Sequence, residues 1–111
     1  MYYMIIHLLR EDRITEVLMA LTEIDARSTQ IVQSRSASEL LAFDVPIFAG
    51  FREMFGRDTE RTQIVSTVIQ NREDVNDFFD MLKIANIHFT EDRIGEVFLL
   101  KIEDAFLIEE E

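Results

Sequence analysis

The sequence of 111 residues is long enough for a single domain, and 48% of its residues are hydrophobic, so we expect a folded chain with a buried core. It contains no cysteine, which excludes disulfides, thiol catalysis and cysteine-based metal sites and fits a cytoplasmic protein. Its 22 acidic and 11 basic residues give a net charge of −11, which disfavours nucleic acid as a partner.

The N-terminal third predicts a strand, a helix and a second strand. Residues 3–9 form a continuous apolar run, short enough for a buried strand and too short for a signal peptide or a membrane span. A helix is expected after Asp12, its predicted N-cap, because apolar residues recur there at helical spacing. These residues are Ile14, Val17, Leu18, Leu21 and Ile24. Residues 28–36 predict a more polar strand at the edge of a sheet.

The C-terminal half repeats this order. Residues 62–70 are rich in β-branched side chains and predict a third strand. Asn71 is the predicted N-cap of a helix over residues 72–85, whose apolar residues again share one face. These residues are Val75, Phe78, Phe79 and Leu82. A fourth strand is expected to begin at Gly95, and residues 105–108 are a candidate for a separate short strand.

The order of elements, β-α-β, a long insertion and β-α-β, predicts an α+β, ferredoxin-like split βαβ fold over residues 1–111. Such a fold has a four-stranded antiparallel sheet with two helices on one face. The apolar runs in the first and fourth strands indicate burial on both faces of the sheet. Two helices cover only one face, so we expect a second copy of the chain to cover the other in a closed homo-oligomer.

The insertion, residues 39–61, predicts a short helix that begins near Pro46 and ends before Gly56. Phe48, Phe51 and Phe55 lie on one side of this helix. Two interpretations remain open: the phenylalanine face packs on the sheet or on a neighbouring subunit, or it binds a groove on a partner protein. Binding to a membrane surface is disfavoured, because the segment lacks a lysine-rich polar face.

The same insertion concentrates positive charge in an acidic protein, at Arg52, Arg57 and Arg61. One interpretation is pairing within the chain, with the acidic residues Glu53, Asp58 and Glu60. The other is an anion-binding patch, which Arg35 could join if both ends of the insertion lie together, because arginine forms bidentate contacts with phosphate and carboxylate.

The segment EVFLLKIEDAFLIEEE resembles the last strand and tail of the PII signal-transduction proteins. The matching residues are Val97, Phe98, Ile102, Glu103, Ala105 and Ile108, together with the LTEI segment at 21–24. The resemblance implies a homotrimer that takes part in signalling, with nitrogen regulation as the family role. It also implies that small molecules such as ATP or ADP bind between subunits, and that residues 39–61 correspond to the loop that contacts partner proteins.

The chain departs from the PII pattern where the family binds phosphate. The glycine-rich loop before the last strand is replaced by Arg93, Ile94, Gly95 and Glu96, and two arginines of the tail are replaced by Leu107 and Glu109. The modified tyrosine of the family loop is absent, because the chain's two tyrosines are Tyr2 and Tyr3.

We therefore predict a PII-like regulatory protein without catalytic residues, whose small-molecule effector is unidentified, with an adenine nucleotide as one candidate. The candidate ligand-binding residues are Arg35, Arg52, Arg57, Arg61, Arg93 and Gly95, and the candidate partner-binding residues are Phe48, Phe51 and Phe55. No spacing of histidines predicts a metal site. The alternative is a trimeric interaction module that has lost nucleotide binding and has no ligand.

Overall fold

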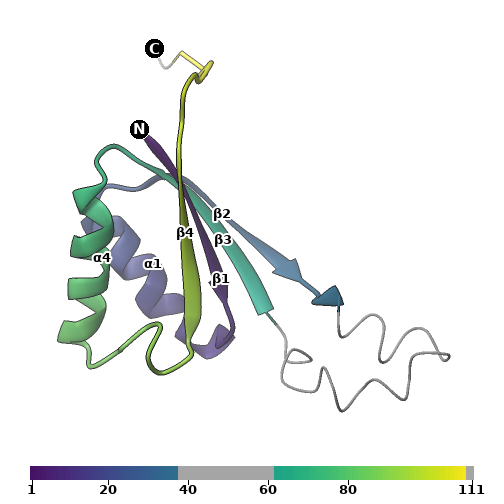
Figure 1. Ribbon diagram of the computed structural model, residues 1–111, viewed down its shortest axis with the longest axis vertical. Helices are drawn as coiled ribbons and strands as arrows, with labels where there is room; N and C mark the ends of the chain where they lie inside the picture. The colour runs from purple at the N-terminus through teal and green to yellow at the C-terminus, as the bar shows by residue number, and fades with distance from the viewer. Residues whose placement is uncertain (38–61, 110–111) are drawn as a thin grey trace, which may run out of the picture.

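The computed structural model describes residues 1–37 and 62–109. The described chain forms a four-stranded antiparallel sheet in the order β2-β3-β1-β4, and both longer helices lie on the same face of it (Figure 1). The elements are β1 (Tyr2–Leu8), a 3-10 turn η1 (Glu11–Arg13), α1 (Ile14–Glu23), β2 (Arg27–Ser34), β3 (Thr62–Ile69), α4 (Glu73–Ile84) and β4 (Gly95–Lys101). The predicted ferredoxin-like fold is confirmed. The helix expected in the insertion, with its three phenylalanines, lies outside the described residues.

Alternation along the strands places one set of side chains under the helices. Met4, Ile6 and Leu8 of β1 are fully buried and pack with the apolar faces of both helices. Four of the buried helical residues are ones that the spacing predicted: Val17 and Leu21 from α1, and Phe78 and Leu82 from α4. Ala20 of α1 is also buried, and the spacing did not predict it. Phe89 and Ile94, from the connection between α4 and β4, close this core.

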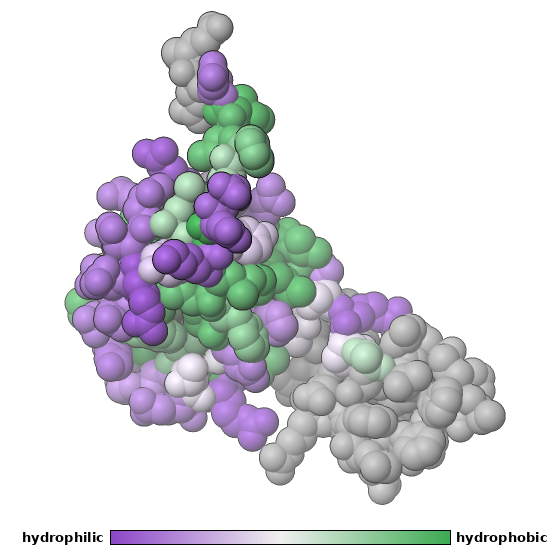
Figure 2. Space-filling view, turned by 45° about the horizontal axis from the view of Figure 1, so that its top comes forward, coloured by the Kyte–Doolittle hydropathy of each residue, from purple (hydrophilic) through white to green (hydrophobic). Residues whose placement is uncertain are grey.

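The opposite face of the sheet is open in the single chain. Tyr3 lies between Val68 of β3 and Leu100 of β4, and it remains 37% exposed, while Leu100 remains 53% exposed. The expectation that β1 and β4 are buried on both faces is therefore not met within one chain, because the described residues cover only the helix face. Figure 2 shows hydrophobic side chains over the middle of the molecule and again along the C-terminal segment.

Both predicted N-caps need correction. The 3-10 turn enters α1, so Asp12 lies inside that turn, and Arg13 occupies the cap position without a capping side-chain hydrogen bond. The cap position of α4 is Arg72, likewise without a capping side-chain hydrogen bond. Asn71 instead donates its backbone N–H to Asp74 Oδ2, at 3.2 Å.

The C-terminal tail, residues 102–109, is not a strand, so the separate short strand predicted at 105–108 is wrong for the described chain. After β4, the backbone N–H of Ile102 donates to the carbonyl of Met1, and the following residues pair with no strand among the described residues. The described chain contains no helix long and apolar enough to cross a membrane.

Candidate functional site

A pocket of about 490 Å³ lies at one end of the sheet, where the ends of β1 and β2 meet the start of β3 and the turn before β4. Its volume is in the range of small-molecule sites. It also lies at the base of the insertion, because Ser36 and Thr62, on either side of residues 38–61, both line it. The lining residues are His7, Leu9, Arg10, Ser34, Arg35, Ser36, Thr62, Gln63, Ile64, Asp92 and Arg93.

Three arginines reach this pocket, hereafter the arginine pocket, from three separate segments. Arg10 follows β1, Arg35 follows β2 and Arg93 lies in the turn before β4. Among the lining residues that the structure describes, Asp92 is the one acidic residue, so three positive charges and one negative charge leave a formal excess of +2. In a chain with a net charge of −11, this local excess points to an anionic ligand.

The turn that carries Arg93 is fixed to the end of β1 by backbone hydrogen bonds. The carbonyl of Ile94 accepts the N–H of Leu9 at 2.8 Å and the N–H of Arg10 at 3.2 Å. Arg93 itself has a left-handed backbone with φ of 56°, and its N–H donates to the carbonyl of Thr90. These backbone contacts place Arg93 beside Arg10.

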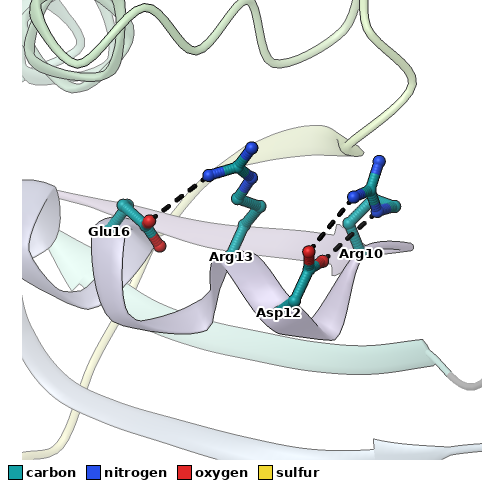
Figure 3. A network of polar contacts seen from close by, with 4 residues as sticks. All are labelled: Arg10, Asp12, Arg13 and Glu16. Atoms are coloured by element: carbon teal, nitrogen blue, oxygen red, sulfur yellow. Dashed lines mark hydrogen bonds and ion pairs between the residues drawn. The ribbon is translucent and has the colours of Figure 1, made fainter.

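Arg10 already has a carboxylate partner. Its Nε and Nη2 atoms donate to the two carboxylate oxygens of Asp12, at 3.2 and 3.1 Å, as Figure 3 shows beside the pair of Arg13 and Glu16. The hydrogen bonds from Arg10 lower the pKa of the Asp12 carboxyl. The pair is exposed, so it adds little stability, but it uses two of the guanidinium N–H donors of Arg10.

The neutral polar groups of the pocket come from β2 and β3. The hydroxyls of Ser34 and Thr62 lie 2.6 Å apart and join the two strands at the base of the insertion. The buried Oε1 atom of Gln63 has no hydrogen-bond partner among the described residues. A buried polar atom without a partner is usually satisfied by water or a ligand, so Gln63 is a further candidate contact.

The structure brings together two of the predicted site residues, Arg35 and Arg93. Their role in ligand binding stays a prediction. Arg52, Arg57, Arg61 and the three candidate partner-binding phenylalanines lie outside the described residues. The described part of the chain also holds no group of three or more His, Cys, Asp or Glu side chains that could bind a metal ion.

Gly95 lies next to the pocket without lining it, and the structure gives it a packing role. A Cβ atom at this position would lie 2.5 Å from the backbone carbonyl oxygen of His7 and 2.6 Å from the Phe89 ring. Its φ is not positive, so close approach, and not backbone conformation, explains the glycine here.

Sequence reasoning missed Arg10 and His7 as pocket residues. The pairing of the strands carries the signal that would have found them, because β1 and β3 are antiparallel and Leu8 lies opposite Gln63. In any split βαβ fold with this order, the residues after the first strand therefore lie beside the start of the third. Arg10 is the first basic residue after that strand.

No family model matches the sequence, and no curated protein matches it either. Among solved structures, the chain is similar to CPII, a nitrogen regulatory PII-like protein from Thiomonas intermedia K12, described as bound to ADP, AMP and bicarbonate. The sequence identity is 17% and the TM-score is 0.48, and the alignment covers 88% of this chain and 81% of that chain.

Proposed function

We propose that this protein is a PII-like regulatory protein that binds a small anionic molecule in the arginine pocket. The observation that carries the proposal is the convergence of Arg35 and Arg93, from segments nearly 60 residues apart in the chain, on a pocket at the base of the insertion. Guanidinium groups bind phosphate or carboxylate by paired hydrogen bonds, so the ligand is a phosphorylated or carboxylated metabolite, such as an adenine nucleotide.

The position of the pocket suggests how binding becomes a signal. Ser36 and Thr62 line the pocket and stand at the two ends of the segment that the insertion occupies. A ligand that contacts these ends differently in two arrangements of the insertion shifts the balance between them by its difference in affinity. In this proposal, residues 39–61 carry the signal to a protein partner.

The proposal includes a homotrimer, which the resemblance implies and the open apolar sheet face supports. Large exposed apolar areas on a monomer usually mark contact surfaces. We expect sedimentation velocity at micromolar concentration to give the mass of three chains of 13.0 kDa. A monomer under these conditions would contradict the trimer.

Thermal unfolding in the presence of candidate ligands tests the anion site. The panel consists of ATP, ADP, AMP, cyclic nucleotides and 2-oxoglutarate, with and without Mg²⁺. A ligand at 100 times its dissociation constant is expected to stabilise the fold by about 2.7 kcal/mol per site and so to raise the Tm by several degrees. In the double variant Arg35→Gln/Arg93→Gln this shift is expected to disappear, because the paired guanidinium donors are lost.

The matched control is Arg27→Gln/Arg72→Gln, which removes the same charge at the opposite end of the sheet, where Arg27 pairs with Val68. We expect this control to keep the full ligand shift. An equal loss of the shift in both double variants would mean that net charge, and not the arginine pocket, binds the ligand. A flat panel for the unmodified protein would favour the interaction module without a ligand.

A further inference from the structure

The C-terminal tail ends in a segment that is both strongly apolar and strongly acidic. Phe106, Leu107 and Ile108 are 98%, 71% and 93% exposed, respectively. They are followed by glutamates at the last three positions of the sequence. Three consecutive large apolar side chains left in water are costly, so the tail has the composition of a segment that binds another surface.

The tail leaves the body of its own chain at the end of the sheet opposite the arginine pocket. Leu8, beside the pocket, pairs with Gly95 at the start of β4, whereas Tyr2 pairs with Lys101 at its end. These two ends of β4 are separated by roughly 20 Å, from six residue steps of a strand. Figure 1 shows the tail continuing away from the sheet beyond β4. A second copy of the chain is therefore the more direct partner for it.

The arginine pocket complements this tail in charge and in its apolar border. Its described lining residues carry a formal excess of two positive charges, in a chain that is otherwise acidic. On the open face of the sheet, Val32, Ile64 and His7 lie side by side across three strands, and the last two of them also line the pocket. The ring of His7 lies 5.1 Å from that of Phe98, which extends the apolar row toward β4.

We propose that the tail of one chain docks in the arginine pocket of a second copy, with Glu109 at Arg35 and Arg93 and the preceding apolar residues on the row of Val32 and Ile64. The inference rests on the proposed function in one respect, that the pocket binds anions. It adds regulation, because the tail carboxylates and a small anionic ligand compete for the same guanidinium groups. Ligand binding then releases a tail, and a docked tail lowers the apparent affinity for ligand.

Disulfide trapping between two single-cysteine variants tests the docking directly. The chain has no cysteine, so Ser36→Cys and Ile108→Cys, carried on co-expressed chains with tags of different size, form a mixed disulfide only where these positions meet. Ile108 is exposed, and replacing it leaves the docking carboxylate of Glu109 in place. The control pairs Ser36→Cys with Asp77→Cys, because Asp77 is also exposed but lies on α4, away from the tail in the sequence. We expect the first pair to form the mixed disulfide at least about tenfold faster than the control.

Equal rates for the two pairs would overturn the proposal. A second pocket variant, Asp92→Cys, keeps the experiment decisive if Ser36→Cys folds poorly, because Asp92 is an exposed lining residue on a different segment. It is expected to trap Ile108→Cys in the same way.

Calorimetric titration with inorganic pyrophosphate separates this inference from the proposed function. If the tail fills about nine pockets in ten, neutralising it in Glu109→Gln/Glu110→Gln/Glu111→Gln is expected to lower the apparent Kd for pyrophosphate roughly tenfold. The control Glu23→Gln/Glu73→Gln/Asp77→Asn makes the same change of charge on the two helices and is expected to leave the Kd within about twofold.

The two proposals fail in different ways. Equal pyrophosphate affinity in the tail variant and its control, without disulfide trapping, would overturn tail docking and leave the anion site intact. Efficient trapping in a protein that binds pyrophosphate in no variant would support tail docking and contradict the small-molecule site.

Discussion

The substitution Phe78→Ala is expected to lower the free energy of unfolding by about 3–5 kcal/mol, a large part of the total stability of a domain of this size. Phe78 is fully buried on the face of α4 that packs against the sheet. Its ring lies edge-on to the rings of Phe79 and Phe89, with centroid distances of 5.4 and 6.0 Å, respectively. Alanine removes these contacts and leaves a cavity that the surrounding strands and helices fill only in part.

Urea unfolding followed by circular dichroism measures this loss. The control is Asp77→Ala, the preceding residue on the same helix, which is exposed and is expected to change the stability by no more than about 0.5 kcal/mol. Phe78→Leu is expected to lie between the two, because most of the buried volume is kept. A loss below about 1 kcal/mol for Phe78→Ala would mean that the ring is not central to the core.

The fold was predictable because its elements carry strong periodic patterns. The spacing of Val75, Phe78, Phe79 and Leu82 fits a helix and no strand, and the observed α4 buries Phe78 and Leu82. The polar character of residues 28–36 likewise identified β2 as an edge strand, and most of its residues are exposed. The order of such elements leaves few topologies, because connections are short and sequential strands tend to lie close together.

Features that depend on a neighbour in space were less predictable. An apolar run such as residues 105–108 has the composition of a strand, but a strand also needs a partner for its backbone groups, and the described chain offers none there. The successive apolar residues of β1 likewise indicated burial on both faces, although the described part of one chain buries only one. In both cases the apolar composition marks a surface that the described part of one chain leaves uncovered, and we propose that a second molecule covers it.

The candidate site likewise contains residues that the sequence predicts and residues whose place depends on a neighbouring strand. Arg35 and Arg93 were predicted from the ends of elements and from the resemblance, and both line the pocket. Arg10 was missed because its place depends on the register between β1 and β3, which no local pattern specifies. The Arg10–Asp12 pair is not predicted either, because the sequence pattern favours Asp12 as a helix cap.

At Gly95 a structural role can be tested against a functional one. The resemblance assigns this residue to ligand binding, whereas the structure places it in tight packing. The backbone carbonyl of His7, whose oxygen would lie 2.5 Å from an added methyl group, belongs to the central strand β1 and cannot turn away as a side chain can. Accommodating alanine therefore requires β4 to move away from β1, together with the turn that holds Arg93 beside Arg10.

We expect Gly95→Ala to lower the free energy of unfolding by about 1–3 kcal/mol in the complete absence of ligand, as overpacking does. The measurement is urea unfolding of the ligand-free protein beside Glu96→Ala, whose side chain is exposed on the open face and whose loss is expected to cost less than about 0.5 kcal/mol. A glycine needed only for the approach of a ligand would leave the ligand-free stability unchanged. Unchanged stability in Gly95→Ala would therefore contradict the packing role and return this residue to the binding site that the resemblance implies.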